Sequence, residues 1–341
     1  MADKQPMAEH VDVLKQFVDN LQLVIVQIQD DHSCRPEDDD ATPFDVDAYW
    51  TRLGAIYRGL SAEATKLSLA FSSPPPPTKK QCEPLLGSLQ GVILALVSAY
   101  YSLPLSQGLT LRKALQNSVL EIVQQVKSLV QNVAHFTAGS SEQLQTTGQV
   151  WQQADSFPSL PKDNKEASLA VVADTSELVT DALQELHEAV HCEEVADFNE
   201  MQERADDEPE VSWSAEDKTL VVSCTGLIKT VKSLLKKTES AVKSQGSCQS
   251  KMAVEVLDKV VEAVIRLSPL VDDLAASLYP PISDEVVREH SNTLSSEIAN
   301  HLSFMRYSYL TTEDDEQWID FLMKANEHNL NKIVKLTSNA P

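Results

Sequence analysis

Glycine is scarce in this sequence, with only 9 residues in a chain of 341. The loops that bind phosphates or present a catalytic serine need glycines at fixed spacing, and no GxGxxG, Walker lysine loop or GxSxG occurs. Runs of alternating β-branched residues, which indicate strands, are also few. The sequence therefore argues against nucleotide-binding loops and nucleophile-elbow hydrolases, and it leaves little room for sheets.

Positive charge is in short supply as well. Lysine and arginine number 28 against 51 aspartates and glutamates, so the net charge is −23. Because affinity for nucleic acids rests on neutralising phosphates, this balance argues against nucleic-acid binding and against anionic membrane surfaces. The N-terminus has no apolar core, and the longest apolar run, Val92 to Tyr101, is too short to span a bilayer. We expect a soluble, intracellular protein with no nucleic-acid or membrane partner.

Cysteine is limited to five widely spaced residues with no CxxC pair, namely Cys34, Cys82, Cys192, Cys224 and Cys248. An odd number without pairing suits a reducing compartment and provides no metal framework. We predict neither a metal nor a cofactor.

The sequence is rich in long amphipathic helices. The clearest lies between Lys251 and Pro281, where apolar residues follow one another in steps of three and four and so share one helix face. They are Ala253, Leu257, Val260, Val264, Leu267, Val271, Leu274 and Leu278. Such a stripe requires partner helices, because a lone helix gains little stability. Pro269 lacks an N–H group and clashes with the preceding turn, so we expect a kink near Ile265 or a new helix capped by Ser268.

Similar stripes predict an all-α fold of about ten helices. Six are expected first, near residues 8–29, 44–71, 79–101, 110–136 and 141–155 and from 163 onward. Between Glu193 and Asp217 the chain then has eleven acidic residues against one basic residue. Four more helices follow this stretch. We predict an N-terminal bundle over residues 1–192, an acidic, flexible linker over 193–212 and a C-terminal bundle over 213–341.

One motif matches a metal-site pattern. His187, Glu188 and His191 form HExxH, the spacing that places two imidazoles one helical turn apart beside a glutamate base. The metzincin continuation is absent, because Glu194 stands where a glycine is needed and Asp197 where a histidine is needed. The two histidines directly follow stripe residues, so we interpret them as lying at the edge of a helix seam. A zinc hydrolase is an alternative supported by this motif alone.

A proline-rich segment separates the second and third predicted helices. Pro74, Pro77 and Lys79 fit PxxP followed by a basic residue, a form that SH3 domains bind as a polyproline helix. The same segment also serves as a stiff connector between two helices. The two interpretations are compatible.

The predicted helix after Trp213 has two further features. Ser214 with Asp217 fits an N-terminal capping box, and the same residues fit a site for an acid-directed kinase, where a phosphate would favour the helix N-terminus. Five lysines, Lys229, Lys232, Lys236, Lys237 and Lys243, give this helix a basic side. Without aromatic or arginine residues among them, we interpret these lysines as solvated or in contact with the acidic linker.

Four segments resemble one known family. Residues 108–113 (GLTLRK), 161–165 (PKDNK), 213–217 (WSAED) and 272–281 (DDLAASLYPP) are similar, in the same order, to segments of the cyclin-D-binding family, also called Grap2 and cyclin-D-interacting proteins. The likeness extends over most of the chain and is weakest in the first forty residues and the acidic stretch. The segments are structural motifs and none is catalytic.

The resemblance implies an all-helical protein without enzymatic activity, found in the nucleus and cytoplasm. It implies binding to D-type cyclins, lower phosphorylation of the retinoblastoma protein, and restraint of cell-cycle progression and transcription. It also implies binding to the Grap2 adaptor and to helix-loop-helix transcription factors. Because Grap2 contains SH2 and SH3 modules, the PxxP segment is a candidate contact.

Two other interaction classes fit the same helices. One is a cytoskeletal scaffold or adaptor bundle of the vinculin or talin type. The other is a helix-loop-helix dimerisation inhibitor without a basic region, which would dimerise through its C-terminal half.

Overall fold

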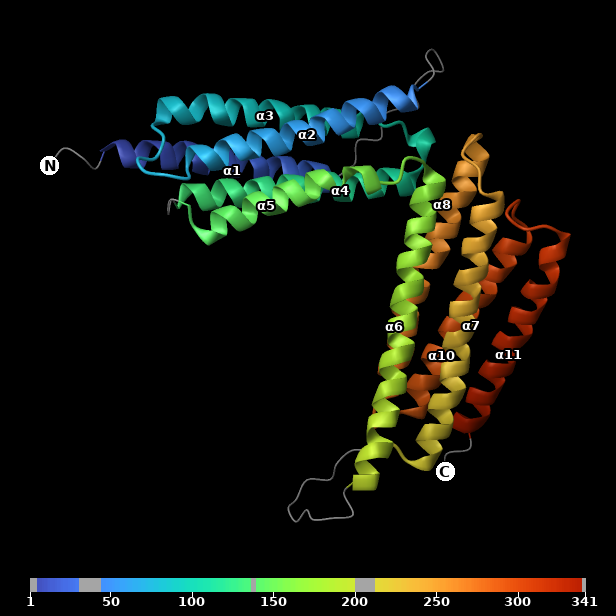
Figure 1. Cartoon of the computed structure of the whole chain (residues 1–341). Coiled ribbons are helices and arrows are strands. Elements are labelled where there is room, and N and C mark those ends of the chain that lie inside the picture. Colours follow the sequence, from blue (N-terminus) through green and yellow to red (C-terminus); the bar gives the residue numbers. More distant parts are fainter. Residues whose placement is uncertain (1–4, 31–43, 136–138, 200–211, 339–341) are drawn as a thin grey trace. The chain divides into compact units, whose positions relative to one another are not determined.

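The computed structural model describes residues 5–30, 44–135, 139–199 and 212–338. Its described residues form helices and connections without a strand, which confirms the predicted all-α fold class (Figure 1). The chain divides into two compact units, residues 1–163 and residues 164–341. Each unit is a helical bundle with its own core.

Unit 1 contains α1 (Gln5–Gln29), α2 (Val46–Ala70), α3 (Lys79–Tyr101), α4 (Leu109–Ala134) and α5 (Ser141–Asp155), with two short 3-10 turns, η1 (Leu105–Gln107) and η2 (Phe157–Ser159). Around the unit the helices follow the order α1, α4, α5, α2 and α3, and α3 returns to α1. The predicted stripes meet inside this ring. Tyr57, Tyr100 and Phe71 are among the largest fully buried side chains, and the Tyr57 hydroxyl lies 2.7 Å from the Ser118 hydroxyl.

One end of α2 is closed by the segment that follows α5. The Lys162 ammonium lies 4.5 Å from the ring centre of Trp50 and 4.3 Å from that of Phe157. In return, the Trp50 indole N–H donates to the Lys162 carbonyl at 3.0 Å. The Phe157 ring covers Gly54 so closely that a Cβ there would fall 2.7 Å from its Cε1 atom. The PKDNK segment (residues 161–165) therefore packs on α2 and stabilises its position through Lys162.

Helix α3 is long and apolar enough to cross a membrane if only length and composition are considered. The apolar run from Val92 to Tyr101 covers only the second half of this helix. One face of α3 packs into the core of unit 1 through Cys82, Leu86, Leu89, Ile93, Leu96, Ala99 and Tyr100. A central helix of a water-soluble bundle also has this composition.

Unit 2 contains α6 (Asn164–Asn199), α7 (Ala215–Gln245), α8 (Lys251–Ile265), α9 (Leu267–Ala276), α10 (Asp284–Arg306), η3 (Glu313–Asp315) and α11 (Glu316–Ser338). Helices α8 and α9 together form one wall. The walls follow the order α6, α7, α11, α10 and α8/α9, and the last contacts α6 again.

The position of α6 corrects the predicted domain boundary. We predicted that residues 1–192 form the first bundle, with six helices there and four beyond, yet α6 packs on α7, α8 and α9 in unit 2. Its stripe residues Val172, Val179 and Leu186 belong to the core of that unit. The helix also continues to Asn199, across the first part of the predicted linker. Residues 200–211 of that linker lie outside the described part of the chain.

The predicted interruption at Pro269 is present. Helix α8 ends at Ile265 and α9 starts at Leu267, so the break lies at Arg266, three residues before Pro269 and within the turn that precedes it. Ser268 lies inside α9 and is buried, which rules out the alternative in which it caps a new helix.

Candidate interaction surfaces

The predicted SH3-ligand segment is accessible between α2 and α3. Pro74 and Lys79 are exposed and Pro77 is half-buried. The start of α3 holds the end of this segment, because the Thr78 backbone N–H donates to Gln81 Oε1 at 2.9 Å. The Pro74–Pro75 peptide bond is cis. Pro74 and Pro77 thus lie on the connection between α2 and α3, and Lys79 is the first residue of α3.

Ser214 forms the capping box expected at the start of α7. Its Oγ accepts the Asp217 backbone N–H at 3.0 Å, and Asp217 Oδ2 accepts the Ser214 backbone N–H at 2.9 Å. Both orphan donors of the first turn are satisfied, so the capping prediction is confirmed. The side chain is exposed. Whether the hydroxyl is phosphorylated stays a prediction.

The entry into α7 has a second attachment that the sequence analysis missed. The Trp213 indole N–H donates to the Leu278 carbonyl at 2.7 Å, just beyond α9. The Trp213 ring also lies against Tyr279, with ring centres 5.7 Å apart. Two of the segments that resemble the cyclin-D-binding family, WSAED and DDLAASLYPP, therefore contact each other. The tryptophan directly before the predicted cap, Trp213, could have indicated a contact at the start of this helix. The sequence does not show that Leu278 is the residue it contacts.

The HExxH residues lie on α6. Leu186 is buried, while His187 and Glu188 next to it are exposed, as expected at the edge of a helix seam. Glu188 accepts a hydrogen bond from Gln184 Nε2 at 2.8 Å. The side chain of His191 lies outside the described residues. Within the described part of the chain, no three His, Cys, Asp or Glu side chains are grouped so that they could hold a metal ion.

The outer side of α7 carries an exposed basic row made of Lys229, Lys232 and Lys236. These three side chains make no ion pair with another described residue, whereas Lys243 pairs with Glu239 at 2.5 Å. Lys237 turns toward α11, where its ammonium lies 5.8 Å from the ring centre of Trp318. The basic row is thus an unpaired cationic feature on the surface of an acidic protein.

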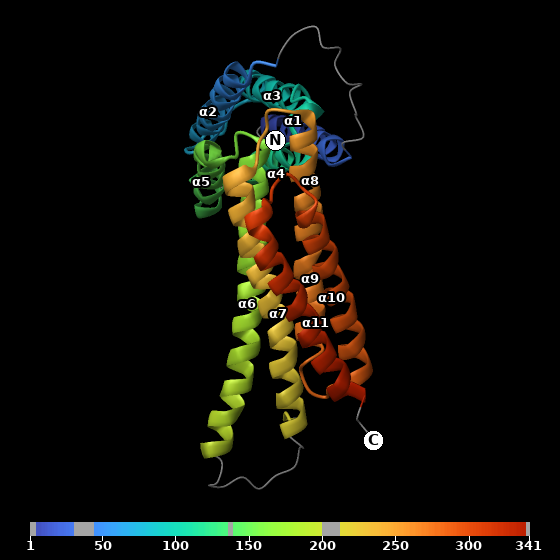
Figure 2. The ribbon, with the colours of Figure 1, turned by 90° about the vertical axis from the view of Figure 1, so that its right-hand side faces the viewer.

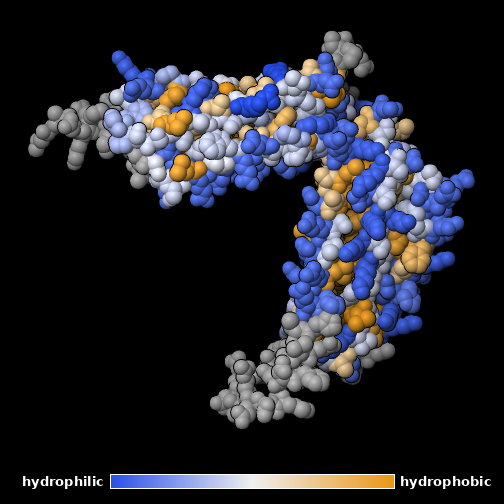
Figure 3. All heavy atoms as spheres, in the orientation of Figure 1, coloured by the Kyte–Doolittle hydropathy of each residue, from blue (hydrophilic) through white to orange (hydrophobic). Residues whose placement is uncertain are grey.

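Exposed apolar side chains also interrupt the charged surface of unit 2. Figure 3 shows them in orange between the blue side chains of unit 2. Leu178 on α6 is 54% exposed and Val222 on α7 is 66% exposed. Single exposed apolar residues are common, but here they accompany the basic row on neighbouring helices.

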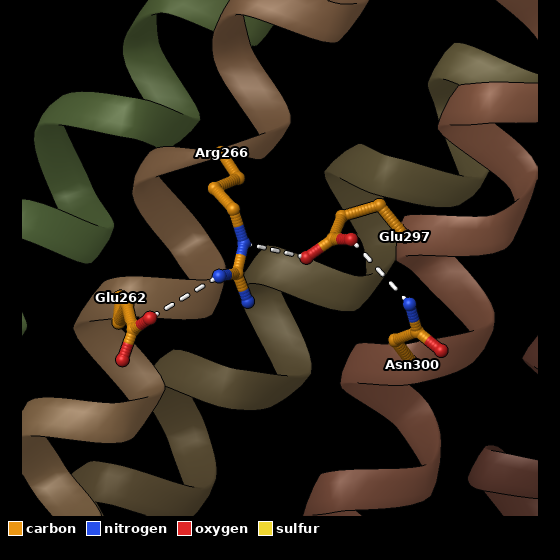
Figure 4. Close-up of polar contacts among 4 residues, drawn as sticks. All are labelled: Glu262, Arg266, Glu297 and Asn300. Carbon is orange, nitrogen blue, oxygen red and sulfur yellow. Dashed lines mark hydrogen bonds and ion pairs between the residues drawn. The ribbon is translucent and has the colours of Figure 1, made fainter.

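A polar network spans the break between α8 and α9. Arg266 Nε donates to Glu297 Oε1 at 2.7 Å, and Arg266 Nη1 donates to Glu262 Oε1 at 3.3 Å (Figure 4). Asn300 Nδ2 lies 3.5 Å from the other oxygen of Glu297. Arg266 is thus held across to α10 at the point where the helix is interrupted. Because its side chain is half-exposed, the ion pairs contribute little stability and mainly orient the arginine.

Beneath this network lies a fully buried histidine of α10. His301 Nε2 is 2.9 Å from the Thr238 hydroxyl of α7, and Nδ1 has no hydrogen-bond partner. Burial, together with the nearby positive charge of Arg266, lowers the pKa of His301 from 6.5 to about 4. The imidazole is therefore neutral at pH 7 and serves as a hydrogen-bonding group inside the bundle.

These features define a class of protein. The described residues form two helical bundles whose distinctive groups are exposed helix faces and a surface connection, the arrangement of a helical interaction protein. Comparison with known proteins makes this more specific. Residues 52–191 match the family model described as Grap2 and cyclin-D-interacting, N-terminal, and residues 199–303 match the corresponding C-terminal model. The chain belongs to the family of Grap2 and cyclin-D-interacting proteins, a family of interaction proteins and not a known enzyme family.

Individual relatives are similar along almost the whole chain. The cyclin-D1-binding protein 1 homolog of Xenopus laevis is 34% identical over 335 residues, covering 96% of this chain and 99% of the relative. The Danio rerio homolog is 35% identical over 306 residues, covering 87% and 89%. Cyclin-D1-binding protein 1 of Homo sapiens is 28% identical over 348 residues, covering 97% and 95%. The N-terminal family model ends within α6, close to the predicted boundary at residue 192 and beyond the boundary between the two units.

Proposed function

We propose that this chain binds D-type cyclins and acts as a regulator without catalytic activity of its own. The observation that carries the proposal is the end-to-end similarity to proteins named cyclin-D1-binding protein 1. The fold is compatible with it, since exposed helix faces at the edge of a bundle are a common way to bind another helix.

The proposed mechanism is occupancy. A cyclin bound to this protein is held away from productive phosphorylation of the retinoblastoma protein, which restrains cell-cycle progression and transcription. The protein acts in both the nucleus and the cytoplasm. The exposed basic row on α7 supports an electrostatic contribution to partner association, because unpaired surface charges mainly raise the association rate.

The test is a titration of the purified full chain into an active complex of cyclin D and its kinase. Binding and phosphorylation of a retinoblastoma substrate are followed together. Saturable binding with falling phosphorylation is expected. Binding without inhibition would contradict the occupancy mechanism while leaving cyclin binding in place. No binding at micromolar concentrations would contradict the proposal as a whole.

We further propose that a Grap2-type adaptor binds Pro74, Pro77 and Lys79 through an SH3 module. The name of the family includes Grap2, and Pro74 and Lys79 are exposed on either side of the half-buried Pro77. Binding of helix-loop-helix transcription factors is proposed on the family resemblance alone. Centrifugation of the isolated factor with the full chain would test it.

A cytoskeletal scaffold is the second candidate function. It is favoured by one observation, the closed rings of long amphipathic helices in both units. This function predicts tight co-sedimentation with actin filaments and no binding to cyclin D. The cyclin proposal predicts the opposite result in both assays.

A further inference from the structure

Helices α7 and α11 lie side by side in unit 2 and run in opposite directions (Figure 2). Asn329 of α11 approaches Gly226 of α7, and its Nδ2 donates to the Thr230 hydroxyl at 3.3 Å. Farther along α7, the Lys237 ammonium lies 5.8 Å from the ring centre of Trp318. As the residue numbers rise on α7, those of the contact residues on α11 fall. Asn329 and Trp318 therefore mark the edge of α11 that faces α7.

Two exposed residues of α11, Phe321 and Lys332, continue this edge toward the solvent. Each lies three residues after a contact residue, Trp318 or Asn329, and residues three apart are neighbours on a helix surface. Phe321 is 68% exposed, and Lys332 is exposed and makes no ion pair with another described residue. The outward edge of α11 beside α7 thus carries a large aromatic ring and a cation.

The basic row lies on the neighbouring outward side of α7. Lys229 and Lys236 are two helical turns apart with Lys232 between them, so the three lysines extend over about 10 Å of one helix side. Val222, which is 66% exposed, lies two turns before Lys229 on the same line. Residues 219–238 contain no acidic residue. The basic row, Val222, Phe321 and Lys332 together form the cationic face.

The carboxylates of α11 lie on its opposite edge. Arg306 of α10 pairs with Glu316 at 3.1 Å and also with Asp320. Glu327 comes two helical turns after Asp320 and therefore lies on the same edge. The acidic side chains of α11 thus face α10, whereas Phe321 and Lys332 lie beside α7.

Other carboxylates adjoin the cationic face without pairing with the basic row. Asp315, near Lys237, accepts hydrogen bonds from the Trp318 indole N–H at 2.7 Å and from the Thr312 backbone N–H at 2.9 Å. Helix α6, the other neighbour of α7, carries several exposed acidic residues, Asp174, Glu177, Asp181 and Glu185. Within the described part of the chain, none of these forms an ion pair with the basic row. The charges of its three lysines are therefore available to an external group.

We propose that the cationic face binds an acidic segment of the protein partner, whose carboxylates contact the basic row while one large apolar side chain covers Phe321. This inference rests on the proposed function, which supplies the partner. The occupant follows from charge complementarity. A chain with a net charge of −23 repels an acidic partner over most of its surface, so a local row of unpaired cations determines where such a segment docks. An exposed aromatic ring beside these cations provides the apolar contact that charge alone does not.

Charge reversal in the full chain tests the role of the basic row. Lys229→Glu, Lys232→Glu and Lys236→Glu are combined, and the variant is titrated into the complex of cyclin D and its kinase. We expect binding at least about tenfold weaker, mainly through slower association, and a weaker dependence on salt. Replacing the same three lysines by arginine keeps the charges and should preserve binding.

The matched control changes the net charge by the same amount at scattered sites. It combines Lys15→Glu, Lys80→Glu and Lys259→Glu, at exposed positions of α1, α3 and α8. This variant should bind like the unaltered protein. Equal weakening by both triple variants would assign the effect to net charge and overturn the proposal. Unchanged binding by the α7 variant would also overturn it and leave cyclin binding intact.

The apolar part of the cationic face is tested by Phe321→Ala. Because the ring is 68% exposed, its removal should leave the bundle folded and weaken binding to the cyclin D complex by at least about fivefold. Leu144→Ala, at a position of α5 that is 64% exposed, is the control and should bind normally. Full affinity of the Phe321→Ala protein would remove the ring from the docking site and overturn this part of the proposal.

A second probe separates this inference from the proposed function. If the unaltered protein does not bind the cyclin D complex, the proposed function fails, and a short fluorescent peptide of glutamates with one leucine decides the inference. Peptide binding at low ionic strength that the α7 reversal abolishes and the scattered control retains would support the cationic face. No peptide binding in that case would overturn it.

Two other occupants are outcomes of the same measurements. A single-stranded RNA that binds more tightly than the peptide, with the same dependence on the basic row, would overturn the assignment to an acidic protein segment. A dimer of the unaltered chain that the α7 reversal dissociates in centrifugation would assign the cationic face to a second copy and would also overturn it.

Discussion

Trp213 and Leu278, which are 65 residues apart in the chain, are joined by a hydrogen bond of 2.7 Å from the indole N–H to the backbone carbonyl. The bond ties the beginning of α7 to the end of α9. Together with the Trp213–Tyr279 ring contact and the capping box, it fixes the start of α7 in unit 2. Because the carbonyl belongs to the backbone, a change at Leu278 itself would not remove the acceptor.

Replacing Trp213 by phenylalanine keeps most of the ring and removes the donor. We expect the free energy of unfolding of unit 2 to fall by about 1 kcal/mol, since the Leu278 carbonyl loses its partner in a half-buried position. Urea unfolding, followed by circular dichroism, measures the change. Trp151→Phe is the matched control, because its N–H bond to Thr65 is exposed and should contribute less. Equal effects of the two substitutions would contradict the prediction.

Two glycines of unit 1 should respond to alanine with opposite signs. At Gly54 a Cβ falls 2.7 Å from the Phe157 ring, and that ring is held by Lys162 and Trp50, so Gly54→Ala should cost about 1 to 3 kcal/mol. At Gly91 nothing lies within 4 Å, and Gly91→Ala should stabilise α3 by roughly 0.5 to 1 kcal/mol. Thermal unfolding of both variants checks the signs. A destabilised Gly91→Ala protein would show that this face of α3 is covered.

His301 should make unit 2 sensitive to acid. The unfolded chain takes up a proton at this imidazole near pH 6.5, whereas burial lowers the pKa in the folded chain to about 4. As pH falls through this window the unfolded state binds the proton first, so the free energy of unfolding falls by about 3 kcal/mol in total. The stability is fully present above pH 6.5.

The measurement is urea unfolding at several pH values between 7 and 4. His301→Gln should lower stability at pH 7 but flatten this part of the pH dependence, because glutamine does not titrate. His328→Gln, at an exposed position of α11, should behave like the unaltered protein. An unchanged slope in the His301→Gln protein would assign the acid sensitivity to other groups.

Ser214 caps α7, and its removal should be measurable. Ser214→Ala is expected to cost about 1 kcal/mol in unit 2, and Ser214→Asp should retain most of the stability because a carboxylate also accepts the Asp217 N–H. Ser212→Ala, two residues earlier, is the control. Mass spectrometry of protein from cells tests the separate prediction that Ser214 is phosphorylated.

The adaptor proposal can be tested on the same connection that carries the prolines. Pro74→Ala combined with Pro77→Ala should weaken binding of a Grap2-type SH3 module by at least about tenfold, because both ridge prolines of the ligand are lost. Pro84→Ala, at an exposed position within α3, leaves the PxxP segment unchanged and should bind normally. Isothermal titration with the isolated module gives the affinities. Full affinity in the double variant would remove this contact from the proposal.

The helices could be predicted from the sequence because their signals are local. Apolar stripes at three-four spacing, the proline at position 269 and the Ser214–Asp217 pair each act within a few residues, and the structure has the corresponding helices, break and cap. The bundle to which a helix belongs is decided by tertiary packing, which these local signals do not contain. The stripe of α6 fits either core equally well, so its assignment to unit 2 could not be read from Val172, Val179 and Leu186.

The interior polar groups were also beyond local reasoning. His301 lies between Ile298 and Leu302 in the sequence of α10. The spacing of the apolar residues alone does not predict that this polar side chain is fully buried. Its hydrogen bond to Thr238 depends on how α7 and α10 align. Likewise, the approach of Asn329 on α11 to Gly226 on α7 depends on how these two helices align.

The assignment of α6 to unit 2 decides where the chain can be divided for separate study. A fragment that begins at residue 213 would lack one wall and would expose the core residues that α6 covers, so it should aggregate when produced alone. A fragment that begins at Asn164 keeps all the walls together. Cleavage within residues 200–211 should likewise leave two pieces that purify as one complex, because α6 remains packed on α7, α8 and α9.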